Sequence, residues 1–193
     1  MIVRRDETGD LLLQSAPDFV LDALQQAADL CESDDPAIRS SLIQDPYEDE
    51  KENEQWRRLV GDDLLHLFES RSEIVRTDLG AAALESSKAE EALDDVTWEV
   101  RVPIQHLSAW QETLNGASHA LFAKYELTGE DTENALALVA SPEKLLAVQQ
   151  IRIYSILLHV LLEAEGYGDP DDIGGPEDFD SPDFDPSESE SDE

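Results

Sequence analysis

The sequence changes character abruptly at Gly166, and this change constrains the fold more than any other feature. Before it, residues 151–162 (IRIYSILLHVLL) are almost entirely apolar. After it, residues 167–193 hold twelve Asp or Glu and neither Lys nor Arg. A segment so charged cannot bury enough apolar surface to fold alone. The sequence therefore predicts a folded domain over residues 1–166 and a disordered acidic tail over residues 167–193.

The acidity is not confined to the tail. The chain has 46 acidic and 13 basic residues and a formal charge of −33. Twelve of the acids lie in the tail, so residues 1–166 still carry −21. This field repels phosphate, so we expect neither nucleic acid nor membrane as a partner. A protein partner that is basic or presents a groove is expected instead, with salt adaptation as the alternative explanation of the charge; the oligomeric state is not predicted.

Three features predict a cytoplasmic protein. Cys31 is the only cysteine, so no intrachain disulfide can form and a reducing compartment is expected. It lies on the apolar side of a predicted helix, which favours a small buried side chain. The first ten residues lack the apolar run of a signal peptide. Polar residues interrupt residues 145–162, so we interpret this segment as a core helix that lies centrally among the others.

A small antiparallel sheet is predicted from three short segments. Residues 2–5 and 11–14 flank a turn that contains Gly9, which is typical of a β-hairpin. Residues 97–102 alternate, with Trp98, Val100 and Val102 on one face. Because two strands alone are marginally stable, we expect this third strand to join the hairpin and the sheet to cap the helices.

The rest of the domain is predicted to be helical. Ser15 is expected to cap a helix whose apolar residues include Val20, Leu24 and Cys31, followed by a short helical turn over residues 37–43. A long helical region is predicted over residues 50–93, with weak points at Gly61 and Gly80 and a break or bend near Gly80. Its expected apolar stripe comprises Leu59, Val60, Leu64, Leu67, Phe68, Arg71 and Val75.

Two further helices complete the predicted bundle. One begins after Pro103, and its apolar stripe runs from Ile104 to Tyr125 at steps of three and four. Residues 128–131 are predicted to be a loop. The last helix begins near Ser141 and ends near Glu165. The fold class is therefore mostly α, a multi-helix bundle with a small antiparallel sheet.

Candidate metal and catalytic residues are few. Asp62, His66, Glu69 and Glu73 are metal-ligand types at helical spacing, but they lie opposite the apolar stripe of their helix and so predict a solvent face. His119 is also expected on a solvent face. His159 is expected to be either buried and neutral or at a helix boundary, rather than a catalytic base. No nucleophile–base arrangement, phosphate-binding loop or dinucleotide motif is present. The sequence predicts no catalytic residue, no metal ligand and no cofactor.

The tail supplies the predicted binding residues. Phe179 and Phe184 are isolated aromatics among acids and prolines. Such rings can anchor on a groove of a partner while the acids raise the association rate. The predicted partner-binding residues are therefore the two rings with Asp178, Asp180, Asp183 and Asp185. The alternative is a solubilising tail with incidental aromatics.

The chain resembles the bacterial family known as domain of unknown function 2017, which is familiar from actinobacteria. The segments that carry the resemblance are the hairpin at residues 2–5, residues 54–64 (EQWRRLVGDDL), the step at Val102-Pro103, and the Trp110…Leu114-Asn115 pattern. It covers most of residues 1–165. Where the family continues with Asp and later Arg, this chain has Gly116, Ala117 and Ser118. The resemblance therefore does not carry over a role for those polar positions.

The family has no assigned activity. Its genes often lie beside the gene for the adaptor that delivers N-degron substrates to the Clp protease, which implies a regulatory, proteolysis-linked binding protein. The first functional hypothesis is therefore a non-enzymatic cytoplasmic interaction protein. The alternatives are an enzyme or metal-binding protein of another type, and a salt-adapted structural subunit.

Overall fold

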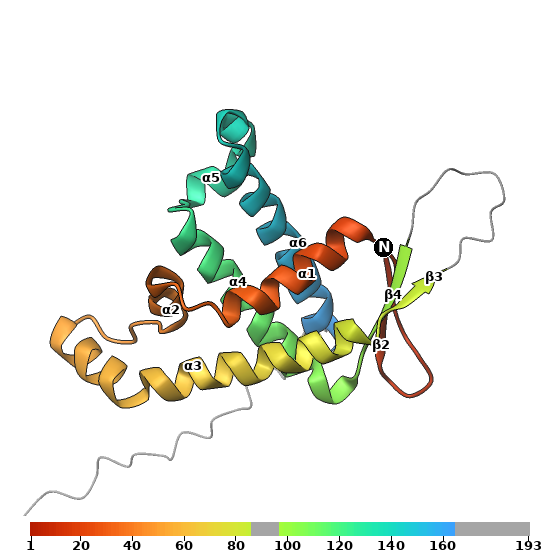
Figure 1. Cartoon of the computed structure of the whole chain (residues 1–193), viewed down its shortest axis with the longest axis horizontal. Coiled ribbons are helices and arrows are strands. Elements are labelled where there is room, and N and C mark those ends of the chain that lie inside the picture. The colour runs from red at the N-terminus through yellow and green to blue at the C-terminus, as the bar shows by residue number, and fades with distance from the viewer. Residues whose placement is uncertain (86–96, 165–193) are drawn as a thin grey trace, which may run out of the picture.

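The structure is a computed structural model that describes residues 1–85 and 97–164. Within these residues the chain is mostly helical with a small antiparallel sheet, as the sequence predicted. The helices lie to one side of the sheet in Figure 1. The predicted tail, 167–193, lies outside the described residues, so the domain boundary at Gly166 stays a prediction.

The sheet has four strands in the order β1-β2-β4-β3. All neighbouring pairs are antiparallel. The strands are β1 (Ile2–Arg5), β2 (Leu11–Pro17), β3 (Ala83–Glu85) and β4 (Thr97–Val102). The predicted hairpin and third strand are thus confirmed, and β4 pairs with the second strand of the hairpin. Val100 and Val102 are buried, and Trp98 on the same face is half-buried.

The predicted cap at Ser15 is wrong. The pairing of β2 with β4 shifts between Leu13 and Ala16, and Ser15 adopts a positive φ of 52° inside this irregularity. The strand therefore continues to Pro17, and α1 (Asp18–Cys31) begins directly after it without a side-chain cap. The predicted apolar residues of this helix are buried, including Val20, Leu24 and Cys31. The short helix α2 (Pro36–Leu42) is confirmed, with Asp35 as its cap.

The long helix α3 (Glu50–Gly80) ends at the break that the sequence predicted near Gly80. The carboxylate of Asp49 caps it, and it ends at Gly80. The next residues form β3, where the sequence predicted helix up to residue 93, because pairing with β4 outweighs a weak helical pattern. Its predicted stripe is partly wrong: Leu59 and Leu67 are exposed, whereas Leu65 and Leu79 are buried. Gly61 does not interrupt the helix, which packs closely on Ile43 there.

The helix α4 (Leu107–Lys124) is the centre of the bundle, and it packs on α1, α2, α3 and α6. A short 3-10 turn, η1 (Ile104–His106), precedes it and leaves Ile104 exposed, contrary to the predicted stripe. Leu107, Trp110 and Leu114 are buried as expected. Small residues on this helix, including Ala117 and Ala120, allow several helices to approach it at once.

The last helix, α6 (Pro142–Ala164), is peripheral, so its predicted central position is wrong. It packs mainly on α4 and on η2 (Ala135–Ala140), and no other described element covers much of its opposite face. The predicted loop at residues 128–131 is also wrong, because the short helix α5 (Gly129–Glu133) begins there with a reciprocal capping box of Thr128 and Asp131.

Candidate interaction surface

An uncharged stripe runs along the uncovered face of α6. It consists of Leu146, Gln149, Ile153, Ile156 and Val160, which recur at steps of three and four residues. Leu146 and Ile156 are each 60 % exposed, and Ile153 and Val160 are half-buried. We call these five residues the α6 stripe. An amphipathic helix normally buries such a stripe, so this helix offers the apolar face on which a further helix could pack.

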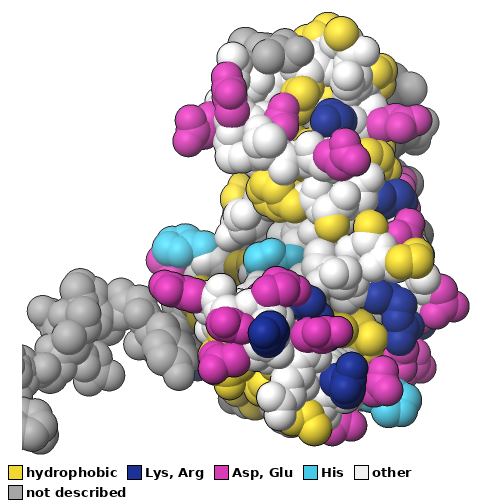
Figure 2. Space-filling model, turned by 90° about the vertical axis from the view of Figure 1, so that its left-hand side faces the viewer, with side chains coloured by type: hydrophobic (Ala, Val, Ile, Leu, Met, Phe, Trp, Pro, Cys, Tyr) yellow, Lys and Arg dark blue, Asp and Glu magenta, His cyan; other side chains and the backbone are white. Residues whose placement is uncertain are grey.

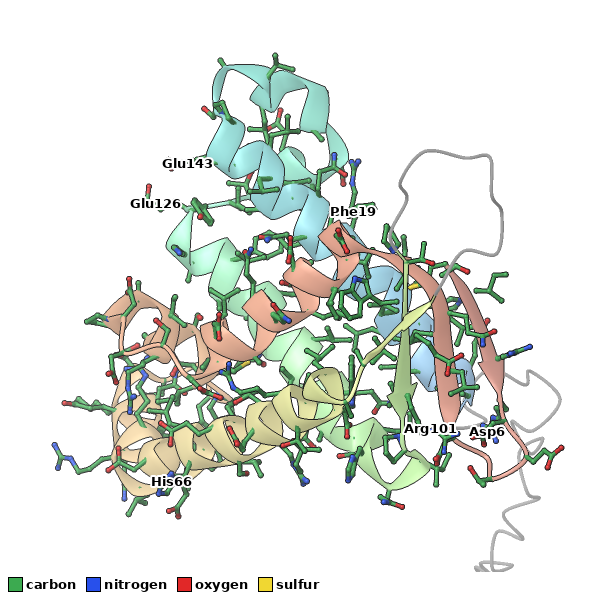
Figure 3. All side chains as sticks on the ribbon, turned by 45° about the vertical axis from the view of Figure 1, so that its right-hand side comes forward. Asp6, Phe19, His66, Arg101, Glu126 and Glu143 are labelled. Atoms are coloured by element: carbon green, nitrogen blue, oxygen red, sulfur yellow. The ribbon has the colours of Figure 1, made fainter. Side chains whose placement is uncertain are left out.

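The first turns of α1 extend this face. Phe19 is 63 % exposed, and Figure 3 shows it at the N-terminal end of α1. Between the two helices lies a groove of about 460 Å³. We call it the α1–α6 groove, and it is lined by Phe19, Asp22, Ala23, Gln26, Leu146, Gln149, Gln150 and Ile153.

Two hydrogen bonds, one part-buried and one buried, join the walls of the groove. Gln150, which is buried on α6, donates from Nε2 to Oε1 of Gln26 on α1 at 2.6 Å. One turn further, the hydroxyl of Tyr154 donates to the backbone oxygen of Ala23 at 2.8 Å. Burial raises the pKa of this phenol above its usual range, with the nearby Cys31 as a smaller cause. These bonds fix the spacing of α1 and α6, so the groove is built into the fold.

The charges at the groove are acidic. Asp22 lines it and is exposed, and no Lys or Arg is among its lining residues. Asp18, at the start of α1, accepts a 2.6 Å hydrogen bond from Nε1 of Trp98 on the sheet. Both basic side chains of α6 are directed to backbone oxygens of the preceding segment: Lys144 to Glu126 and Arg152 to Thr132. The margin of the groove therefore keeps a negative charge.

Elsewhere in the described residues, several arginines are held in ion pairs. Arg57 pairs with Asp45 and Glu50, and these bonds raise the pKa of its guanidinium. The Nη2 atom of Arg101 lies 2.9 Å from Oδ2 of Asp6 at the hairpin turn, and Figure 3 labels both residues. Arg71 and Arg76 bridge α3 to carboxylates of other helices. Figure 2 shows Asp and Glu side chains spread over the face that it presents. Since acids outnumber bases and these bases are paired, the field around the domain is negative.

The candidate metal residues on α3 do not form a site. Asp62, His66 and Glu73 are exposed, as predicted. The Nδ1 atom of His66 lies 2.9 Å from Glu69, a pair at the surface. Among residues 1–85 and 97–164, no group of three or more His, Cys, Asp or Glu could hold a metal ion.

The other histidines and the cysteine have structural surroundings. Of the two alternatives predicted for His159, burial is wrong. Its side chain is 74 % exposed, and its Nε2 atom lies 3.2 Å from Oε1 of Glu163 on the same helix. His119 is half-buried beside Gln44 rather than fully exposed. Cys31 is buried as predicted, and burial, with a smaller effect of Glu32, raises the pKa of its thiol to about 12.

A second, smaller apolar patch lies where α3 begins. Tyr47 and Trp56 meet edge to face with their ring centroids 6.4 Å apart. Beside them, Leu59 is 70 % exposed, and the pocket of about 320 Å³ also includes Glu52 and Gln55. Several acidic residues lie between Tyr47 and Trp56 in the sequence, whereas the α6 stripe contains no charged residue.

The predicted tail residues are not placed by the structure. Phe179, Phe184 and their acidic neighbours, Asp178, Asp180, Asp183 and Asp185, lie outside the described residues. The sequence prediction missed the α1–α6 groove because it assigned α6 to the centre. The spacing of Leu146, Ile153 and Ile156 was a usable signal, but an apolar helix gives the same pattern on a buried face.

The apolar character of α6 also meets the criteria of length and composition for a membrane span, and it is the only helix to do so within the described ranges. In that window 39 % of the residues are buried inside the domain. One face of the helix therefore packs on α4, and the opposite face presents the α6 stripe.

Comparison with known proteins identifies a family. A family model described as domain of unknown function (DUF2017) matches residues 4–165, which confirms the resemblance drawn from the sequence. No curated protein and no solved structure matches the chain.

Proposed function

We propose that this chain, which belongs to the DUF2017 family, is a non-enzymatic protein-interaction protein whose partner binds the α1–α6 groove and the α6 stripe. One observation carries the proposal: Phe19, Leu146 and Ile156 are each at least 60 % exposed on neighbouring helices of a very acidic domain. Single exposed apolar side chains are ordinary, but a contiguous patch marks an interaction site.

The size of this patch sets the expected affinity. Fully burying one large apolar side chain contributes about 1.5–3 kcal/mol. Because Phe19, Leu146 and Ile156 are each only about 60 % exposed, covering the three contributes about 3–5 kcal/mol. Association costs about 4–15 kcal/mol in lost translational and rotational freedom. Apolar burial alone therefore supports weak binding, and the partner must add polar or charged contacts. Reversible binding of this kind suits a regulatory protein.

The proposal includes a cytoplasmic location and a role in Clp-type regulated proteolysis. Support for that role comes from the gene neighbourhood that the family resemblance implies. The tail rings, Phe179 and Phe184, are a second proposed anchor, with Asp178, Asp180, Asp183 and Asp185 steering the partner. The groove and the tail can act on one partner, because the tail follows directly on α6 in the sequence.

Co-purification of the full-length chain from native lysate tests the function. The test variant is Leu146→Glu, and the control is Leu59→Glu, which makes the same change at an exposed leucine of α3. The captured protein is identified, purified and titrated against each variant. We expect Leu146→Glu to weaken its binding about tenfold or more while Leu59→Glu does not. Equal binding to both variants would refute the groove as the binding surface.

A further inference from the structure

We infer that the occupant of the α1–α6 groove is an amphipathic helix of a partner protein that carries Lys or Arg beside its apolar side chains. This inference rests on the proposed function and names the chemistry of the partner. It combines the shape of the α6 stripe with the charge at its margin.

The geometry favours a helix as the bound element. Residues 146, 149, 153, 156 and 160 repeat at an average of 3.5 residues, which is the spacing of a helix–helix seam. The stripe rises about 21 Å along α6, which corresponds to a partner helix of about 14 residues. Phe19 forms one wall of the groove. The groove is lined by residues of both helices, so a partner helix that lies along the α6 stripe can also contact α1. An amphipathic helix docks in this way by laying its apolar face on such a surface.

The charges favour a basic partner. Asp22 lines the groove, and Lys144 and Arg152 are directed to backbone oxygens. Residues 1–166 carry a formal charge of −21. A second copy of this chain would bring the same negative charge to the interface, and so would the acidic tail folding back on the groove. Like charges brought together cost several kcal/mol, whereas complementary charges raise the association rate. A basic helix is the occupant that this margin attracts.

The sequence after α6 supports the same assignment. Thirteen acidic residues follow within 29 positions of Ala164, the last residue of α6. A basic helix along α6 places one of its ends beside the start of this acidic segment. The tail then adds long-range attraction to the apolar contacts of the groove.

Three synthetic peptides of about 15 residues test the inference against the full-length chain by fluorescence anisotropy at about 0.15 M salt. The first has Leu at helix-face positions and Lys elsewhere. The second replaces each Lys by Glu. The third has the composition of the first in an order that destroys the apolar face. We expect the first to bind about tenfold more tightly than the third, and the second not to bind.

Two variants separate groove binding from general attraction to an acidic protein. Leu146→Glu and Leu59→Glu add the same charge, so general attraction would strengthen binding of the basic peptide equally in both. Groove binding predicts that Leu146→Glu weakens it about tenfold and that Leu59→Glu leaves it unchanged or slightly tighter. Equal affinity for the ordered and disordered peptides would overturn the inference.

Other occupants give distinct results. A wild-type dimer that Leu146→Glu makes monomeric, measured by light scattering, would assign the groove to a second copy. Tighter peptide binding by Phe179→Ala/Phe184→Ala would assign it to the tail of this chain, and cosedimentation with phosphatidylcholine vesicles would assign it to a membrane. Each would overturn the inference. If the identified native partner needs Leu146 but the basic peptide does not bind, the proposed function stands and the helix assignment fails.

Discussion

The buried carboxylate of Asp78 accepts a hydrogen bond from the indole Nε1 of Trp110 at 2.8 Å. Asp78 is near the end of α3 and is 8 % exposed, and Trp110 lies in the first turn of α4. The Nδ1 atom of His106, in the turn before α4, lies 3.0 Å from the same carboxylate. This cluster fixes the long helix α3 to the central helix α4.

We expect Asp78→Ala to lower the free energy of unfolding by about 2–3 kcal/mol, because the indole N–H loses its acceptor in a dry environment. His106 is half-buried and can hydrogen-bond to water instead, so the loss of its contact with Asp78 adds less to this destabilisation. Asp62→Ala on the exposed side of the same helix removes the same charge and should change stability by less than about 0.5 kcal/mol. Urea unfolding measures both, and equal effects of the two substitutions would show that the cluster does not stabilise the fold.

Gly116 lies where α4 meets α2 and α3. A methyl group there would come within 2.8 Å of Cε1 of Phe68 and 3.2 Å of Cδ2 of Leu42. We expect Gly116→Ala to destabilise the fold by about 1 kcal/mol, because overpacking outweighs the better helix propensity of alanine. Gly80→Ala is the matched control, since nothing lies within 4 Å of the added carbon. Thermal unfolding should show a lower midpoint for Gly116→Ala alone; a rise in both would mean that the contact is soft.

The buried thiol of Cys31 predicts a pH dependence of stability. Its pKa is raised to about 12 by burial, against 9.0 for a free thiol. Above about pH 9 the unfolded thiol ionises while the folded one stays protonated, so this contribution to stability is complete below pH 9 and falls as the pH rises toward 12.

Between about pH 8 and pH 10 the wild type should lose about 1 kcal/mol more stability than Cys31→Ala. The comparison removes the effect of Tyr154, whose pKa is also raised. The same burial predicts that a thiol reagent labels Cys31 in urea and hardly at all in the native state. Rapid native labelling at pH 8 would contradict a buried thiol.

Divalent metals separate the interaction protein from the metal-binding alternative. We expect Zn²⁺ or Mg²⁺ to move the thermal midpoint by no more than NaCl of equal ionic strength, because ions that only screen repulsion act alike. A ligand that binds only the native state must raise the midpoint further. A larger shift with one metal would support the metal-binding alternative.

Local patterns in the sequence predicted most of the elements. The hairpin, the third strand and most apolar residues of α1 and α4 were predictable. Their signals were a turn that contains Gly9, the alternation over residues 97–102, and apolar residues at steps of three and four. Ser15 has the features of a helix cap, but strand pairing carries β2 past it. The helix predicted beyond Gly80 gave way to β3, since pairing with a distant strand cannot be read from the segment itself.

The candidate surface was harder to predict. Leu146 and Ile156 look like core residues in the sequence, because an apolar helix contacting a partner and one inside a bundle bury the same residue types. Their exposure follows from the small residues of α4, such as Ala117 and Ala120, which make α4 the central helix and leave α6 outside. That is a tertiary property. A single sequence can therefore show that α6 has an apolar stripe, but not whether this stripe is buried in the domain or exposed.

Photo-crosslinking in living cells tests the central claim most directly. A photoreactive amino acid replaces Ile156 in the full-length chain, and the control carries it at Leu59, which is at least as exposed. We expect one discrete adduct from position 156, with the crosslinked peptide of the partner forming a basic amphipathic helix, and no such adduct from position 59. The same adducts from both positions, or none from position 156, would contradict it.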